Sequence, residues 1–201
     1  MARKKYQPKN KSSSTLRIIG GQWRSRKLQL IDAPGMRPTP DRIRETLFNW
    51  LQNDINGAKC LDLFAGSGAL GLEALSRGAS DVVFIEKNKT VASQLKANLQ
   101  LLKSEIGIIN EDALAYLSAL PDLEQKSFDT IFLDPPYRKG LLESSLKLLN
   151  EKSLIHSHTL IYIEHEAEES LDWGIFGLEI IKQSNAGQVH SFLARSNDAH
   201  I

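Results

Sequence analysis

The amino-acid sequence predicts an α/β fold in which a mostly parallel sheet carries helices on both faces and follows an N-terminal β-hairpin. From residue 59 onward, strand-like apolar runs alternate with segments of helical periodicity, a pattern typical of a parallel sheet covered on both sides. Before that point, two short strand-like runs flank Gly20-Gly21, which indicates a hairpin. The length of 201 residues fits one domain, taking ~150 residues per domain as a guide.

The composition is that of an ordinary soluble globular protein, with 41% hydrophobic and 24% charged residues. No apolar run is long enough to span a bilayer, and none follows the basic start at Met1–Lys5, so we expect neither a membrane segment nor a secretory signal. The single cysteine, Cys60, cannot form an internal disulfide. Together these features predict a cytoplasmic protein without a membrane partner.

Charge is distributed unevenly along the chain. Residues 1–44 carry twelve Lys and Arg but only two acidic residues, a net charge of +10, whereas residues 45–201 carry −9. A basic N-terminal segment on an acidic body is typical of an arm that binds a polyanion. For residues 1–15 alone, which are polar and Ser-rich, a solvated, disordered tail is an equal alternative.

The first ordered elements are expected between residues 16 and 51. The runs Leu16–Ile19 and Trp23–Leu30 form the hairpin. After a loop, a helix opens with Thr39 as its cap and Pro40 at its first position. Its apolar residues recur at helical spacing and should face the core; they are Ile43, Leu47, Trp50 and Leu51.

The α/β unit is expected to occupy residues 39–201 and to form one domain with the hairpin and loop of residues 16–38. Strands are predicted at residues 59–64, 81–86, 106–110, 128–133 and 158–164. Helices are predicted at about 69–78, 88–103, 112–119 and 140–150. Residues 178–182 and 188–194, around Asn185-Ala186-Gly187, are interpreted as a closing hairpin.

A glycine-rich loop joins the first strand of this unit to its helix. The sequence LDLFAGSGALG at residues 61–71 contains G-x-G-x-x-G, whose glycines permit a tight turn and let a ligand approach the backbone. Glu86 ends the next strand, 20 residues after Gly66, where a carboxylate can bond both ribose hydroxyls of a nucleoside. On its own this pattern also fits NAD or FAD.

Asp62 distinguishes between these nucleotide ligands. It lies four residues before the first glycine, where its carboxylate would sit beside the anionic phosphates of a dinucleotide. The same carboxylate suits a ligand with a positive ammonium group, and S-adenosylmethionine has an amino-acid end, an adenosine and a cationic sulfonium. Asp62 therefore favours S-adenosylmethionine, with an ordinary surface carboxylate at a strand end as the alternative.

A second motif, Asp134-Pro135-Pro136-Tyr137, follows the strand predicted at 128–133, and ligands of open parallel sheets bind outside such carboxyl ends. The two prolines are rigid, so they hold the Asp134 carboxylate and the Pro135 carbonyl as fixed acceptors. Two acceptors on the N–H groups of a base amine stabilise the positive charge that develops on nitrogen during methyl transfer. Tyr137 can stack on the base.

Together the two motifs resemble those of the Rossmann-like amino-methyltransferases, which act on N6 of adenine, N4 of cytosine or N2 of guanine. Three further segments narrow the resemblance: RIIGGQWR at 17–24, RPTPDRIRETLFNWL at 37–51 and AGSGALGLEALSRGA at 65–79. From about residue 16 to 192 the chain resembles the bacterial 16S ribosomal RNA (guanine 966)-N2 methyltransferase family. The resemblance implies a class I S-adenosylmethionine-dependent methyltransferase fold with a seven-stranded, mostly parallel sheet. It also implies 16S ribosomal RNA as the partner, within the small subunit or an assembly intermediate, and we expect a monomer.

Roles for individual residues follow from the motifs, the resemblance and the charge pattern. The residues expected to bind S-adenosylmethionine are Asp62, Phe64, Gly66, Ser67, Gly68, Glu86, Asp112 and Thr39. Asp112 would approach the adenine amino group, although a helix cap is an equal alternative. The residues expected to act on the base amine are Asp134, Pro135, Pro136 and Tyr137. The residues expected to contact RNA are Arg17, Arg24, Arg26, Lys27, Arg37 and Arg42.

Two other functions stay open at this stage. A DNA adenine-N6 or cytosine-N4 methyltransferase usually carries a separate target-recognition domain, for which this chain has little room. A non-catalytic RNA-binding protein on the same scaffold is disfavoured because both motifs are intact. No metal site is predicted, since His156, His158 and His165 lack further ligands. Cys60 is interpreted as a buried thiol, and the acidic run at 164–169 as a solvated surface.

Overall fold

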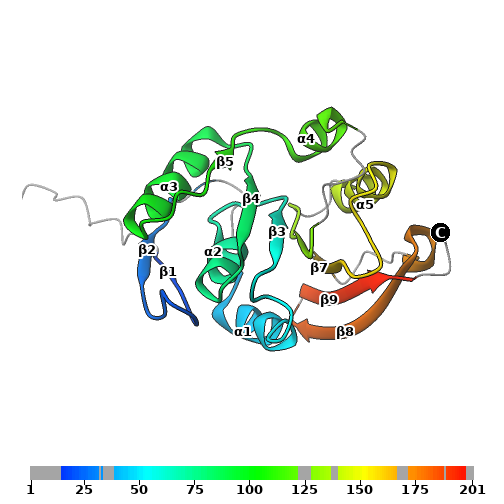
Figure 1. The fold of residues 1–201 in the computed structure, drawn as a ribbon, viewed down its shortest axis with the longest axis horizontal. Helices are drawn as coiled ribbons and strands as arrows, with labels where there is room; N and C mark the ends of the chain where they lie inside the picture. Colours follow the sequence, from blue (N-terminus) through cyan, green and yellow to red (C-terminus); the bar gives the residue numbers. More distant parts are fainter. Residues whose placement is uncertain are drawn as a thin grey trace, which may run out of the picture.

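The computed structural model describes residues 15–31, 33, 39–121, 128–136, 140–166, 172–187 and 189–197. Among them, seven strands form one sheet in the order β5-β4-β3-β6-β7-β9-β8 (Figure 1). The strands are β3 (Lys59–Asp62), β4 (Asp81–Ile85), β5 (Ile108–Ile109), β6 (Thr130–Leu133), β7 (Leu160–Glu166), β8 (Leu178–Ala186) and β9 (Val189–Ser196). The pairs from β5 to β7 are parallel, and β9 pairs antiparallel with both β7 and β8. The predicted mostly parallel sheet with a closing hairpin is confirmed.

Helices cover both faces of this sheet, as the βαβα alternation predicts. They are α1 (Asp41–Trp50), α2 (Ala69–Ser76), α3 (Lys89–Leu101), α4 (Ala113–Ala119) and α5 (Leu141–Glu151), with a short 3-10 helix η1 (Trp173–Phe176). Buried side chains of α1, α2 and α3 belong to one core cluster, and those of α4 and α5 belong to another. Strand residues alternate between the clusters: Phe132 faces the first, whereas Ile131 and Leu133 face the second. No helix in the described ranges is both long and apolar enough to cross a membrane.

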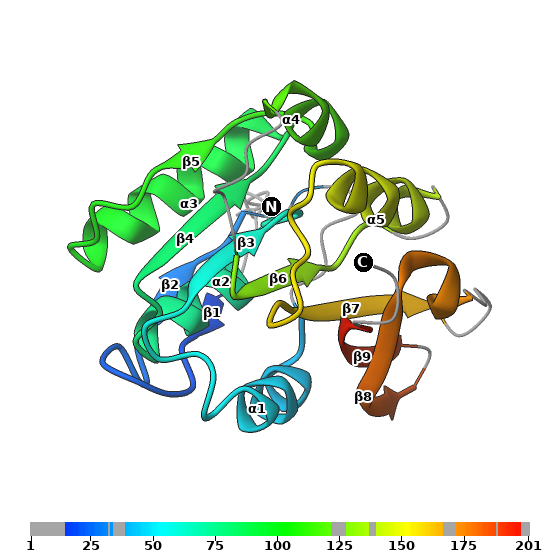
Figure 2. The ribbon, with the colours of Figure 1, turned by 45° about the vertical axis from the view of Figure 1, so that its right-hand side comes forward.

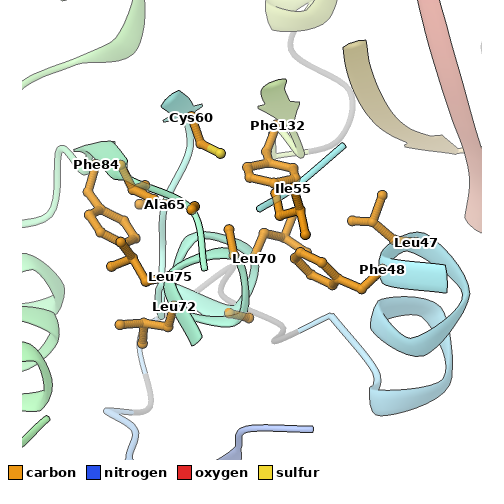
Figure 3. Close-up of a cluster of buried hydrophobic side chains, with 14 of the residues drawn as sticks. Leu47, Phe48, Ile55, Cys60, Ala65, Leu70, Leu72, Leu75, Phe84 and Phe132 are labelled. Carbon is orange, nitrogen blue, oxygen red and sulfur yellow. The ribbon is translucent and has the colours of Figure 1, made fainter. Parts of the chain in front are cut away.

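The first core cluster holds α1 and α2 against the middle of the sheet (Figure 3). Phe48 of α1 packs on Phe132 of β6 with ring centroids 6.1 Å apart. Leu70 and Leu72 of α2 are buried in the same cluster. Because the N-terminus of α2 follows the carboxyl end of β3, this packing fixes where the glycine-rich loop lies.

Helix α1 begins differently from the prediction. Pro40, rather than Thr39, occupies the N-cap position, and no side chain caps the helix. Leu47 and Leu51 are fully buried as expected, but Trp50 is only half-buried at the edge of the cluster. The hydroxyl of Thr39 is not available to the helix because it bonds a residue of the second motif, described below.

The N-terminal hairpin pairs β1 (Thr15–Arg17) with β2 (Lys27–Gln29) and forms a small sheet of its own. The predicted hairpin is confirmed, but its strands are shorter than the predicted runs at 16–19 and 23–30, and Gly20-Gly21 is only part of the connection at 18–26. Those glycines let the segment lie on the C-terminal end of α2. Gly21 has φ +73°, and a Cβ there would meet the carbonyl oxygen of Ser76 at 1.7 Å, so only glycine fits.

A buried ionic network attaches this hairpin to the domain. Glu73 of α2 accepts hydrogen bonds from the backbone N–H groups of Ile19 (2.8 Å) and Gly20 (2.7 Å). Its carboxylate also pairs with Arg44 of α1 (3.4 Å) and Arg77 (2.8 Å). Since Arg44 and Glu73 are both completely buried, their charges depend on one another. The network joins the hairpin, α1 and α2 into one unit.

The other elements agree with the predicted ranges at their centres and differ at their ends. Strand β5 is two residues long where five were predicted, and β8 and β9 extend beyond the predicted hairpin. These differences leave the topology unchanged, so the carboxyl ends of β3, β4 and β6 meet at one edge of the sheet.

Candidate active site

A cavity of about 670 Å³ opens at the carboxyl ends of the parallel strands. Loops after β3, β4, β5 and β6 line it, together with the start of α1 and the tip of the β8–β9 hairpin. The structure brings into this lining most residues that the sequence nominates, namely Thr39, Arg42, Asp62, Phe64, Gly66, Ser67, Glu86, Asp112, Asp134, Pro135 and Pro136. Both motifs therefore serve the same cavity.

Asp62, the last residue of β3, lines the cavity just before the glycine-rich loop. Asp62 Oδ2 accepts a hydrogen bond from the backbone N–H of Gly71 at 3.0 Å. Burial raises the pKa of Asp62 to about 7, and the charges of Asp134 and Glu86 add to the effect. Gly68 does not line the cavity: it is the N-cap residue of α2, with φ +78°. Its positive φ turns the chain into the helix, and its expected role in cofactor binding stays a prediction.

Glu86, at the end of β4, accepts a hydrogen bond from the glycine-rich loop. Its Oε2 accepts from the N–H of Gly66 at 2.9 Å, and its Oε1 accepts from the N–H of Asn88 at 2.6 Å. Asn88 in turn caps α3 through its side chain. Because each carboxylate oxygen has two lone pairs, both oxygens of Glu86 keep capacity for one further donor.

Asp112 has the geometry of a helix cap. Its Oδ1 accepts from the N–H groups of Leu114 (3.0 Å) and Ala115 (3.4 Å) at the start of α4. The residue also lines the cavity, so the cap interpretation and a place in the site hold together. In this geometry Oδ1 accepts the capping hydrogen bonds, and Oδ2 takes no part in the cap.

The second motif follows β6, the parallel neighbour of the strand that precedes the glycine-rich loop. Asp134 follows β6, and its Oδ2 accepts a hydrogen bond from the hydroxyl of Thr39 at 3.3 Å. Enclosure in the cavity raises the pKa of the Asp134 carboxyl, and the bond from Thr39 opposes that shift. Thr39 is therefore a support for Asp134 rather than the predicted helix cap. Tyr137, the last residue of the motif, lies outside the described residues.

Glu164 lines the cavity, although its position in an acidic run predicted a surface residue. The acidic run that contains it was predicted to be a solvated surface, yet Glu164 is only 2% exposed and lines the cavity beside Asp134. Alternation along β7 explains the difference. Tyr162 and Glu164 share one face of the strand, and the partner residue of Glu164 on β9 is Ser191, which is also buried.

The basic residues expected to bind RNA fall into two places. Arg42 is exposed on α1 and lines the cavity. Arg24, Arg26 and Lys27 are exposed residues of the hairpin. Figure 2 shows the hairpin strands β1 and β2 beside α2, and a bond from Gln22 N to Ser76 O (2.7 Å) fixes the turn to the C-terminal end of that helix. That end of α2 is opposite the cavity.

The remaining residues considered from the sequence are Arg17, Arg37 and Cys60. Arg17 is exposed and forms an ion pair with Asp41 at 2.8 Å. Arg37 lies outside the described residues. Cys60 is buried within the first core cluster, and burial raises the pKa of its thiol. Within the described ranges no group of three or more His, Cys, Asp or Glu side chains is arranged to hold a metal ion.

Comparisons with known proteins agree with this geometry. Residues 16–195 match the family described as conserved hypothetical protein 95. The chain is 45% identical to the ribosomal RNA small subunit methyltransferase D of Escherichia coli K12 over 90% of each chain, and 47% identical to its namesake from Haemophilus influenzae over 84% of this chain and 87% of the other.

Among solved structures, a putative methyltransferase from Escherichia coli superposes with a TM-score of 0.78 at 41% identity and covers 92% of this chain and 99% of that one. The predicted class I methyltransferase fold and the predicted family resemblance are thus confirmed. The chain belongs to the conserved hypothetical protein 95 family and is a relative of the small-subunit ribosomal RNA methyltransferases D.

Proposed function

We propose that this protein transfers a methyl group from S-adenosylmethionine to the N2 amino group of a guanine in 16S ribosomal RNA. The observation that carries the proposal is the presence, in one cavity, of the Asp134-Pro135-Pro136 motif together with Asp62 and Glu86. The names of the relatives support small-subunit ribosomal RNA as the substrate. The substrate is the small subunit or one of its assembly intermediates, on which the protein acts as a cytoplasmic monomer.

The acceptors that line the cavity match the hydrogen-bond donors of S-adenosylmethionine. Glu86 would accept from the ribose hydroxyls with the lone pairs that Gly66 and Asn88 leave unused. Asp62, buried and bonded once to Gly71, would accept from the ammonium group, and a cation beside it would lower its raised pKa. Phe64, Ser67 and Asp112 would complete this end of the site. When bound, S-adenosylmethionine supplies a methyl group on a cationic sulfonium.

The residues of the second motif act on the base. A base amine is a poor nucleophile because its lone pair is delocalised into the ring. Hydrogen bonds from its two N–H groups to the Asp134 carboxylate and the Pro135 carbonyl stabilise the positive charge that grows on nitrogen. Thr39 orients that carboxylate. After transfer, the extra proton leaves the nitrogen, and an Asp134 carboxyl with a raised pKa is suited to receive it. Tyr137 would stack on the base.

RNA binding is assigned to two basic regions. Arg42 and Arg37 would contact the RNA at the cavity, and Arg17, Arg24, Arg26 and Lys27 of the hairpin would bind phosphates further away. Residues 16–201 would work as one methyltransferase domain, with residues 1–15 as a basic tail.

The test compares modified nucleosides in 16S ribosomal RNA from cells that lack the protein with those from cells complemented by the wild-type chain or by Asp134→Ala. N2-methylguanosine should fall by one residue per 16S molecule in the deletion strain and return only with the wild-type chain. Loss of a methylated adenine or cytosine instead would identify a different base, and an unchanged nucleoside profile would refute the function.

A further inference from the structure

A buried carboxyl stands next to the catalytic motif without a role in the proposed chemistry. Glu164 lies near the carboxyl end of β7, which is the parallel neighbour of β6. The register pairs Leu133 with Ile163, so Asp134 and Glu164 follow at the next pair of positions. Glu164 is 2% exposed and lines the cavity together with Asp134 and Pro135. Both carboxyls therefore belong to the same end of the site.

Among the described residues, the hydrogen bonds of Glu164 involve only one of its two carboxyl oxygens. The hydroxyl of Tyr162 donates to Oε1 at 2.7 Å and lies 3.2 Å from Ser191 Oγ. No donor of the described residues bonds Oε2, and no Lys or Arg among them forms an ion pair with Glu164. Burial and the neighbouring Asp134 charge raise the pKa of Glu164. Keeping a carboxyl in such surroundings is costly, which is typical of groups that serve a ligand.

Building on the proposed function, we propose that Glu164 reads the Watson–Crick edge of the target guanine by accepting a hydrogen bond from its N1–H. In guanine the N1–H donor is adjacent to the N2 amine that Asp134 and Pro135 would hold. In adenine and cytosine the ring nitrogen beside the exocyclic amine is an acceptor, and its lone pair would face the oxygen of Glu164. The motif fits all three amines, so Glu164 supplies the discrimination between them.

Discrimination of N1–H from a ring-nitrogen lone pair requires the ionised carboxylate of Glu164, because a neutral carboxyl also presents an O–H that donates to such a lone pair. An ionised carboxylate accepts through either oxygen. A site built to bond a substrate N–H rejects analogues that lack it, because its buried acceptor is then left unpaired. Ser191, in contrast, contacts Tyr162 and does not line the cavity, so it provides a matched control on the same face.

The experiment uses small ribosomal subunits reconstituted with guanine or with 2-aminopurine at the target nucleotide. 2-Aminopurine keeps the 2-amino group but has a lone pair in place of N1–H. The full-length wild-type protein should methylate guanine at least ~10-fold faster than 2-aminopurine, the scale of one hydrogen bond to a charged group. Glu164→Leu should lose ~10- to 150-fold in kcat/KM on guanine and little on 2-aminopurine, so the preference collapses. Glu164→Gln, which keeps an acceptor oxygen, should be intermediate.

The controls separate this inference from the proposed function. Ser191→Ala should keep the wild-type preference, and calorimetry should give all folded variants the wild-type affinity for S-adenosylmethionine. If the wild-type protein does not discriminate between the two bases, or if Glu164→Gln and Glu164→Leu keep the full preference, Glu164 does not read N1–H. If Glu164→Leu does not fold, the wild-type preference and Glu164→Gln decide. If wild-type protein binds S-adenosylmethionine but methylates neither subunit, the proposed function itself fails.

Discussion

Three carboxyls that line one cavity, those of Asp62, Asp134 and Glu164, have pKa values raised mainly by burial. From the described residues each accepts one hydrogen bond, donated by Gly71 N, the Thr39 hydroxyl and the Tyr162 hydroxyl respectively. Folding has thus gathered acceptors where no cation of the described residues neutralises them. Ligands that bring N–H donors and positive charge relieve this arrangement, which is what an ammonium group and a base amine provide.

At Asp134 we expect substitution to separate catalysis from cofactor binding. Asp134→Ala should lower methyl transfer by at least ~100-fold, the scale of losing one preorganised electrostatic group. Asp134→Asn should be less severe, because its amide oxygen still accepts a hydrogen bond. Methyl transfer to small subunits and calorimetry with S-adenosylmethionine measure the two effects. Equal turnover of Asp134→Ala and wild type would contradict the assignment.

Glu86 provides the corresponding test of cofactor binding. Glu86→Ala should weaken S-adenosylmethionine binding by ~1.5–3 kcal/mol, typical of hydrogen bonds to a charged group. Calorimetry with S-adenosylmethionine and with NAD should show binding of the first alone. Glu105→Ala, an exposed carboxylate that does not line the cavity, is the matched control and should leave the affinity unchanged. Tight binding of NAD in place of S-adenosylmethionine would overturn the interpretation of the glycine-rich loop.

At the scale of elements, periodicity predicted the order of strands and helices well and their ends less well. Strand β6 was located within two residues, because three of its four residues are apolar and its side chains are buried on both faces. Helix α1 was found from its apolar spacing, but Thr39 could not be recognised as a partner of Asp134, 95 residues away. The length of the hairpin connection was not predicted, for a similar reason. Gly20 and Gly21 pack against the C-terminal end of α2, and a contact with a distant helix cannot be recognised from local turn residues.

The site residues that belong to a local sequence motif could be predicted, whereas those that the fold brings in from other strands and helices could not. The loop from Asp62 and the motif at Asp134 carry their own spacing signals. Glu164 carries no such signal, because a glutamate within an acidic run is predicted to be a surface residue. Its burial follows only when the alternation of side chains along the strand is considered residue by residue. Arg44 is similar: its burial depends on Glu73, which comes from a different helix.

The network centred on Glu73 should determine whether the hairpin and helices stay together. Glu73→Ala would leave the buried Arg44 guanidinium with the partly exposed Asp41 as its remaining carboxylate partner among the described residues, and would release two backbone N–H groups of the hairpin. We expect a loss of ~3–5 kcal/mol in the free energy of unfolding, measured with urea. Glu179→Ala removes an exposed ion pair between β8 and β9 and should cost no more than ~1 kcal/mol. Similar stabilities for the two variants would show that the network is dispensable.

For the whole molecule, the carboxyl cluster makes stability depend on pH. Burial raises the pKa of Asp62 from 3.8 to about 7 and that of Glu164 from 4.5 to about 8. The folded state therefore holds protons that the unfolded chain releases, and this contribution is complete below about pH 4 and lost as pH rises through the folded values. Each group lowers the free energy of unfolding by at most about 1.4 kcal/mol per pH unit in that window.

Urea unfolding of the ligand-free protein across about pH 5 to 9 checks this dependence. Glu164→Gln does not titrate at this position, so its stability relative to wild type should increase with pH. A stability difference between the two proteins that stays constant with pH would contradict the raised pKa of Glu164.

The separation of charge across the whole molecule leads to the last prediction, on RNA docking. Arg24, Arg26 and Lys27 lie on a hairpin fixed at the end of α2 away from the cavity, whereas Arg42 lies at the cavity itself. Ordered charges lose less entropy on binding than charges on a tail. Replacing the three hairpin residues by Gln should weaken RNA binding and lower its salt dependence by up to ~0.7 per lost contact on single-stranded RNA. Turnover at saturating RNA and S-adenosylmethionine affinity should stay unchanged, because the cavity is intact.

Three comparisons make that experiment decisive. Arg42→Gln should lower turnover as well as affinity, and removal of residues 1–11 should have a smaller effect than the hairpin variant. A control that replaces three exposed basic residues elsewhere, Lys147, Lys182 and Arg195, should bind RNA like the wild type, since the acidic body contributes little attraction to phosphates. Binding is measured on ribosomal RNA fragments and on small subunits over a salt series. If the hairpin variant keeps both the affinity and the salt slope of the wild type, the hairpin does not dock RNA, and recognition must lie around Arg42 and the mouth of the cavity.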